Sequence, residues 1–204
     1  GYAVAFSDLV LAPFMPSNTA RSAGTIYPVA SNIPLIFEST PEHEPRKLGA
    51  YISWVAIATT CVTSSMFLTA LAPNLLAVDL INKGTGHMIS WGAWASIMLP
   101  LMIPLFLLTP WLVYVVYPPT QKNSPEAPAW AAEELKKLGG ITSKELLMAG
   151  LAVVALALWI FSKDLGIDST TTAISIVSIM VLANVITWDD VISNKAAFNV
   201  LIWF

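Results

Sequence analysis

Charged side chains are scarce in this sequence: Asp, Glu, Lys and Arg make up 11% of the 204 residues, whereas hydrophobic residues make up 56%. A soluble domain carries about 25% charged residues. Too few polar side chains are therefore present to cover a water-facing surface, and the composition predicts an all-α polytopic membrane protein. The net charge of −3 provides no basic surface, which argues against nucleic acid as a partner.

Cysteine and histidine are also rare. Cys61 is the only cysteine, so an internal disulfide is excluded, and its apolar and small neighbours predict an inert, buried thiol. His43 and His87 lie in polar connections without ligand spacing, so we expect solvated side chains and no metal site. The absence of His-Glu-x-x-His, of Gly-x-Ser-x-Gly and of histidines within apolar runs argues against an intramembrane enzyme.

Long apolar runs dominate the sequence, and a helical crossing needs about 20 apolar residues. The runs cover residues 51–81, 88–117, 146–162 and 172–188, and residues 199–204 look like the start of a fifth. The chain begins without methionine and ends inside this last run, so we expect it to be a piece of a longer protein.

Residues 118–145 form a polar connector between apolar runs. The stretch "NSPEAPAWAAEELKKLGG" predicts a short helix that lies on the membrane surface. Its local signals are Ser124 as the N-cap, Pro125 in the first turn, Gly139 after the last turn and an i,i+4 pair of Glu133 with Lys137.

Lysine and arginine are distributed unevenly between the polar connections. The loop 38–48 carries Arg46 and Lys47, and the connector carries further lysines. Two apolar runs separate these segments, so both should lie on one face, whereas the opposite loops hold only Lys83 and Lys163. The positive-inside rule places the loop 38–48 and the connector in the cytoplasm.

The first apolar segment is interrupted by "APFMPSNTARSAG", residues 12–24. The flanks 1–12 and 26–37 are each about half of a membrane crossing. They form either one kinked span or a re-entrant hairpin that opens on the cytoplasmic side. Irregular backbone at membrane depth requires burial in protein or a water-filled cavity.

The polar tip of this interruption suits an anion. Ser17, Asn18 and Thr19 offer hydrogen-bonding side chains, and the following helix begins with free N–H groups and a positive dipole end. A carboxylate is the expected guest. The alternative is a cytoplasmic turn with Arg21 in solvent. Asp8, on the first arm, carries little functional weight in this interpretation.

A second interruption lies at Ala72, Pro73 and Asn74, inside the apolar run 51–81. Proline removes a helical hydrogen bond, and Asn74 brings an amide to the same level. Two interrupted apolar segments are typical of a transporter binding site. Asp79 lies near the end of the run with Lys83 four residues later, which favours an interfacial pair over a proton-coupling carboxylate.

The stretches "SDLVLAPFMPSNTARSAGTIYP", "SSMFLTALAPNLLA", "AWAAEELKKLG" and "ITWDDVISNKAAFNVLIWF" closely resemble the divalent anion/sodium symporter superfamily. The resemblance covers the whole chain and is greatest to the branch of citrate/succinate exchangers and 2-oxoglutarate/malate translocators. It implies an elevator-type transporter of di- and tricarboxylates in the bacterial inner membrane, built from two inverted repeats and forming a homodimer.

The resemblance also implies which segments of the chain form which elements of the transporter. It makes residues 1–37 a re-entrant hairpin, 49–117 a broken and a continuous transmembrane helix, 118–145 the cytoplasmic connector, and 146–204 helices that lead into a second repeat. Ser17, Asn18 and Thr19 would contact the substrate carboxylate. The facing break, with Thr69, Ala72, Pro73 and Asn74, would complete a substrate or cation site.

Two departures from the symporter pattern affect sodium. The facing break lacks the glycine and threonine of the symporters' Gly-Thr-Pro-Pro-Asn, and Pro13 stands where symporters tend to have a serine. Because sodium needs oxygen ligands, we expect carboxylate exchange without a cofactor. Sodium-coupled symport, with sodium as the coupling ion, is the alternative, and a non-transporting membrane subunit is a distant one.

Overall fold

The computed structural model describes residues 1–123, 125, 127–195 and 198, and every regular element in them is helical, which confirms the all-α prediction for these residues. The chain divides into two compact units: residues 1–88 with 94–139, and residues 89–93 with 140–204. The expected N-cap Ser124 and the expected fifth span 199–204 lie outside the described residues.

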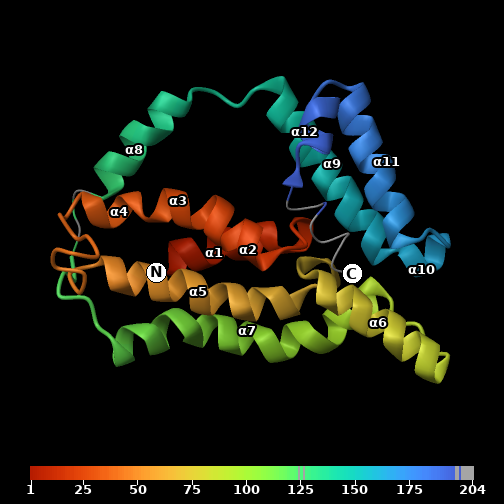
Figure 1. The fold of residues 1–204 in the computed structure, drawn as a ribbon, viewed down its shortest axis with the longest axis horizontal. Coiled ribbons are helices and arrows are strands. Elements are labelled where there is room, and N and C mark those ends of the chain that lie inside the picture. Colours follow the sequence, from red (N-terminus) through yellow and green to blue (C-terminus); the bar gives the residue numbers. More distant parts are fainter. Residues whose placement is uncertain (124, 126, 196–197, 199–204) are drawn as a thin grey trace. The chain divides into compact units, whose positions relative to one another are not determined.

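The chain begins with a helical hairpin (Figure 1). Its first arm consists of α1 (Tyr2–Leu11) and the 3₁₀ turn η1 (Ala12–Phe14). Met15 and Ser17 then have extended backbones, and the second arm follows. This arm comprises α2 (Asn18–Arg21), the π-helical turn η2 (Ser22–Ile26), α3 (Tyr27–Ala30) and α4 (Asn32–Leu35). The interruption is thus the tip of a hairpin and not a kink in one helix.

The helices α5 (Gly49–Met66) and α7 (Trp91–Val116) run antiparallel. At one end the Tyr51 hydroxyl donates to the carbonyl of Pro110 at 3.3 Å, and at the other the Trp94 indole donates to the carbonyl of Ser65 at 3.1 Å. The hairpin also packs against α5, and the three segments share a core that includes Val4, Ala5, Ile26, Ile52, Val55, Ala56, Met66, Phe106 and Val113.

The second interruption lies earlier than its proline indicated. Helix α5 ends at Met66, a 3₁₀ turn η3 (Leu68–Ala70) follows between extended residues, and α6 (Ala72–Thr85) begins directly before Pro73. In the first turn of a helix a proline removes no hydrogen bond, because that N–H has no partner there anyway. Pro73 therefore starts α6, and the break is at residues 67–71.

Several side chains can be compared with their expected environments. Cys61 is exposed on α5, so the prediction of a buried thiol is wrong. The pair of Asp79 and Lys83 is confirmed, with 2.6 Å between carboxylate and ammonium and both side chains exposed. His43 and His87 are exposed as expected.

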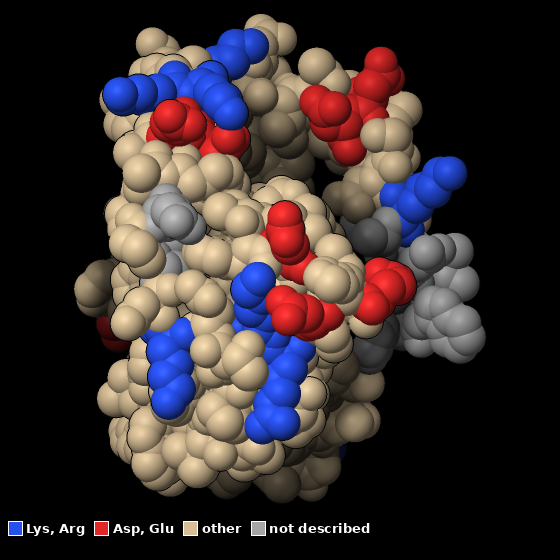
Figure 2. Space-filling view, turned by 90° about the vertical axis from the view of Figure 1, so that its left-hand side faces the viewer, with Lys and Arg blue, Asp and Glu red and all other residues tan. Residues whose placement is uncertain are grey.

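The loop 38–48 lies against the segment after α7. Thr120 N–H donates to the Arg46 carbonyl at 3.1 Å, and Gln121 N–H to that of Lys47 at 3.0 Å. The Arg46 guanidinium also lies 4.9 Å from the ring centre of Tyr117. The loop and the start of the connector therefore share one end of the unit, as the count of apolar runs requires, and Figure 2 shows charged side chains of both signs gathered on this face.

The connector contains α8 (Ala127–Leu138), and Gly139 follows with the left-handed φ of +80° expected after a last helical turn. Its lysine pairs differently from the prediction: Lys137 bonds Glu134 at 2.5 Å, three residues away, and not Glu133. The hydrogen bond and charge of Glu134 raise the pKa of the Lys137 ammonium.

The second unit contains α9 (Ser143–Ile160), α10 (Ser162–Leu165), α11 (Ser169–Leu182) and α12 (Trp188–Ile192). Helix α9 begins three residues before the expected span, because Thr142 and Glu145 form a capping box. The expected span 172–188 is wrong in extent: α11 ends at Leu182, Asn184 has a φ of +53°, and Thr187 caps the separate helix α12.

Within the described residues, α7 and α9 have the length and hydropathy to cross a bilayer, with 26 and 18 residues and mean hydropathies of 2.0 and 1.8. Helix α5 also has 18 residues, but it carries buried hydroxyl side chains along one side. These hydroxyls, on Thr59, Thr60, Thr63 and Ser64, lower its hydropathy and face the interior of the unit.

Ser39 connects the loop to the start of α5. Its hydroxyl is 2% exposed, donates to the Glu44 carbonyl at 2.9 Å and accepts from the N–H groups of Leu48 and Gly49 at 3.2 and 3.0 Å. We predict that Ser39→Ala in the full-length protein weakens folding by about 1–3 kcal/mol, because the partly buried N–H groups of Leu48 and Gly49 lose their acceptor.

The measurement is the apparent thermal unfolding midpoint in detergent. The control is Ser7→Ala, which removes an exposed hydroxyl that donates to the Ala3 carbonyl within its own helix. Equal midpoints for the two variants would contradict the role of Ser39.

Candidate functional site

The three polar residues predicted to meet a ligand lie together at the hairpin tip. Ser17 caps the second arm, and its hydroxyl accepts from the N–H of Ala20 at 3.2 Å. The Thr19 hydroxyl lies 3.4 Å from the side-chain oxygen of Asn18. Within the described residues the amide nitrogen of Asn18 has no hydrogen-bond partner, and Asn18 is only half-buried. Asn18 therefore presents two free donor hydrogens at the tip.

The structure brings this tip against the break between α5 and α6. Ala72 N–H donates to the carbonyl of Pro16 at 3.1 Å. The Thr69 hydroxyl donates to the carbonyl of Pro13 at 2.6 Å. One residue of the break and the first residue of α6 thus donate hydrogen bonds to backbone carbonyls of the tip, so polar groups of the two irregular segments satisfy one another.

The side-chain amide of Asn74, unlike that of Asn18, donates both of its hydrogens to the protein. Its side-chain nitrogen donates to the carbonyls of Ser64 at 2.8 Å and Phe67 at 3.2 Å, so both amide hydrogens are used to cap the end of α5. Only its carbonyl oxygen is left for a ligand. An oxygen atom suits a cation or a donor group, and it repels a carboxylate.

Behind the tip lies a buried ion pair that the sequence analysis did not predict. The Arg21 side chain is 0% exposed and that of Asp8 is 2% exposed, with 3.1 Å between the Arg21 Nε and the Asp8 Oδ1. The alternative interpretation, an ordinary turn with Arg21 in solvent, is therefore wrong, and Asp8 is buried together with Arg21. The turn connects two arms that bury opposite charges between them.

The guanidinium contacts every segment around the tip. Nη1 donates to the carbonyl of Met15 in the tip at 3.0 Å and to that of Ala70 in the break at 3.1 Å. Nη2 lies 3.1–3.3 Å from three hydroxyls of α5, which belong to Thr60, Thr63 and Ser64. Thr63 also donates to the second carboxylate oxygen of Asp8. All nitrogens of the guanidinium therefore have protein acceptors.

A signal for this cluster was present in the sequence. Thr60, Thr63 and Ser64 recur at i, i+3 and i+4, so they share one face of a helix, and this face is polar in an otherwise apolar run. A polar stripe inside an apolar unit requires a polar partner. The two charged residues of the interrupted segment, Asp8 and Arg21, were the available partners.

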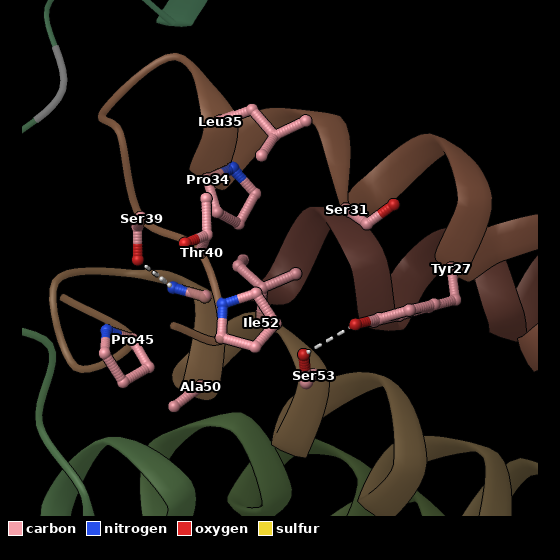
Figure 3. A pocket seen from close by; sticks show the side chains of 12 residues that line it. Tyr27, Ser31, Pro34, Leu35, Ser39, Thr40, Pro45, Ala50, Ile52 and Ser53 are labelled. Carbon is pink, nitrogen blue, oxygen red and sulfur yellow. Dashed lines mark hydrogen bonds between the residues drawn. The ribbon is translucent and has the colours of Figure 1, made fainter. Parts of the chain in front are cut away.

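A cavity near the start of α5 lies away from the tip (Figure 3). It has a volume of about 480 Å³ and lies between the second arm of the hairpin, the loop after it and the first turns of α5. Its lining is mainly apolar, with Pro34, Leu35 and Ile52, and a hydrogen bond of 3.1 Å joins the hydroxyls of Tyr27 and Ser53 at its edge. None of the predicted site residues lines this cavity.

We favour the tip over this cavity as a site for an anion, because an anion needs hydrogen-bond donors: the tip offers unpaired donors, whereas the cavity offers mostly apolar surface. Among the described residues no group of three or more His, Cys, Asp or Glu side chains is arranged to hold a metal ion.

Comparison with known proteins adds a family match. The model of the family described as "Sodium:sulfate symporter transmembrane region" matches residues 1–204. Proteins named L-tartrate/succinate antiporter from Escherichia coli (strain K12), Shigella flexneri and Shigella sonnei are each 50% identical to the chain over 204 residues. The match covers 100% of the chain and 42% of each of these relatives, so the chain spans less than half of their length.

The contacts of Asn74 lead to a stability prediction. We expect Asn74→Ala in the full-length protein to destabilise it by about 1–2 kcal/mol, because the carbonyls that end α5 lose their donor. Asn74→Asp should have an effect in the same direction, since a carboxylate donates no hydrogen bond. The readout is the unfolding midpoint in detergent, compared with Asn82→Ala near the other end of α6. A larger loss for Asn82→Ala would refute this capping role.

Proposed function

Since the chain belongs to the sodium:sulfate symporter family over its whole length, we propose that it forms one half of the binding site of a secondary transporter that exchanges di- and tricarboxylates. The chain belongs to a family of transmembrane transporters and is not an enzyme, and we assign it to the bacterial inner membrane, since its relatives are bacterial antiporters. The substrate class comprises citrate, succinate, malate, 2-oxoglutarate and tartrate.

The observation that carries this proposal is the free amide of Asn18 at a hairpin tip that rests on a helix break. A carboxylate accepts hydrogen bonds from neutral donors such as an amide, a hydroxyl and backbone N–H groups, and such donors bind it without a permanently exposed cation. Ser17, Asn18 and Thr19 supply these donors. Thr69, Ala72 and Asn74 fix the opposing backbone through their contacts with the tip and with α5.

Exchange without sodium is supported by the way backbone carbonyls are used. In transporters, carbonyls of unwound helices are the groups that coordinate sodium. Here the Arg21 guanidinium occupies the carbonyls of Met15 in the tip and Ala70 in the break. Thr69 occupies the Pro13 carbonyl, and Pro13 itself has no hydroxyl to offer. Sodium-coupled symport, the second candidate, would need oxygen ligands from elsewhere.

The remaining architecture belongs to the same proposal. The hairpin is re-entrant and opens toward the cytoplasm, where the loop 38–48 and the connector lie. The rest of the full-length protein supplies an inverted second repeat that completes the site. The functional unit is a homodimer in the lipid bilayer. A subunit without its own ligand is less well supported, because it gives no role to the free donors at the tip.

The substrate site is tested with Asn18→Ala in the full-length protein, reconstituted into proteoliposomes loaded with unlabelled succinate. We predict that uptake of labelled dicarboxylate falls at least about tenfold, since the amide donors are lost at the centre of the site. The control is Asn32→Ala, whose side chain donates to the Pro28 carbonyl at 3.1 Å within the second arm. Uptake by Asn18→Ala at the level of the control would end this site assignment.

The dependence of transport on sodium is tested with counterflow of labelled citrate, succinate, malate, tartrate and 2-oxoglutarate. We predict that replacing all sodium by choline changes the exchange rate less than about twofold, because the carbonyls of Pro13, Met15 and Ala70 already accept hydrogen bonds from Thr69 and Arg21. The rates with the five acids would rank the substrates. Exchange that stops without sodium would establish the symporter alternative.

A further inference from the structure

Asp8 occupies a position from which it controls the tip. It lies on α1, on the first arm of the hairpin, and its two carboxylate oxygens contact two other segments: Oδ1 accepts from Arg21 on the second arm, and Oδ2 accepts from Thr63 on α5. A single buried carboxylate thus joins both arms of the hairpin to the helix that precedes the break.

The geometry separates Arg21 from the substrate. A cation next to an anion site would be expected to bind the anion directly. Here the side chain has no exposed surface, and Nε, Nη1 and Nη2 all donate to protein oxygens. A charged guanidinium that is fully hydrogen-bonded and paired with a carboxylate gains little by exchanging these partners for a ligand.

The backbone of Arg21 connects the position of its guanidinium to the turn that carries the Asn18 amide. Its N–H donates to the Ser17 carbonyl at 3.0 Å and closes the first turn of the second arm, so the position of the guanidinium fixes the turn that carries Asn18. Through Nη1 the same side chain binds the tip to the break. Displacement of the guanidinium would therefore move both sides of the site.

We infer that Asp8 is a positioning residue for substrate binding: its carboxylate compensates the charge of Arg21 and locks the guanidinium between the tip and the break, so that the ligand meets only neutral donors. The role in substrate binding rests on the proposed function and is tested by transport, whereas the role in positioning the tip is tested by a distance measurement that does not depend on transport. Asp8→Asn removes the counter-charge, and a buried cation without a partner must rearrange or recruit water.

The transport arm compares Asp8→Asn, Arg21→Gln and the double variant with the full-length wild type in proteoliposomes. We expect the KM for succinate exchange to rise at least about tenfold in Asp8→Asn, with a smaller change in maximal rate, because donor placement is lost. The double variant should have a KM no higher than the worse single variant, since the pair acts as a unit. The control is Asp79→Asn, which breaks an exposed ion pair. A lower KM in Asp8→Asn would mean that the freed Arg21 binds the substrate, and it would overturn the inference.

The structural arm measures the distance between spin labels at Ala23 on the hairpin and Leu75 on α6, in a Cys61→Ser background. We expect Asp8→Asn to broaden the distance distribution and Thr63→Val to broaden it less, whereas Asp79→Asn leaves it unchanged. An unchanged distribution in Asp8→Asn would overturn the inference even if transport were lost. If Asp8→Asn does not fold, the double variant and Thr63→Val replace it in both the transport experiment and the distance measurement. A wild type that exchanges no carboxylate would defeat the proposed function, and the label distances would still decide the role of Asp8.

Discussion

A guanidinium buried at the centre of an apolar unit determines much of the structure around it. Removal of such an ion from water costs several kcal/mol even after relaxation, and the cost is offset only by a close counter-ion and a full set of acceptors. Arg21 obtains these from four segments: Asp8 on α1, the carbonyls of Met15 and Ala70, and the hydroxyls of α5. The hairpin, the break and α5 are therefore bound to one another through a single side chain.

This constraint accounts for features that look unrelated along the sequence. Helix α5 carries threonines and serines where an ordinary span would carry leucines, because its inner face meets a cation. The chain leaves α-helical geometry at residues 67–71, which directs the Ala70 carbonyl to Nη1 and lets the Asn74 amide cap the end of α5. The irregular backbone of the tip and the break is satisfied internally, because each carbonyl named here accepts a hydrogen bond from the protein.

Local signals were sufficient to predict much of the fold. The interruption at residues 12–24, the exposed pair of Asp79 and Lys83 and the left-handed Gly139 each depend on neighbours within a few residues, so a single sequence displays them. These local signals left open whether the interruption was a kink or a hairpin tip. The end of α11 was missed because an apolar run continues past Leu182 while the backbone turns at Asn184. Pro73 was misinterpreted for a related reason: a proline marks either a break or the start of a helix, and only the position of the preceding turn distinguishes them.

The polar residues of the candidate site could be predicted from the sequence, but the contacts between them could not. Ser17, Asn18 and Thr19 are recognisable as polar residues between apolar arms, but the pairing of Asp8 with Arg21 spans the tip, and Thr63 is 42 residues from Arg21. The prediction of a buried Cys61 failed for the same reason, since burial on α5 depends on which face of the helix meets the hairpin.

The use of Arg21 in place of a dissociable cation matters for the proposed exchange. In the proposed carrier, a cation that is covalently part of the chain would hold carbonyls that a dissociable ion would have to bind anew in each cycle. A tip organised by Arg21 and Asp8 would then be preformed for the next anion, which favours the proposed exchange of one carboxylate for another.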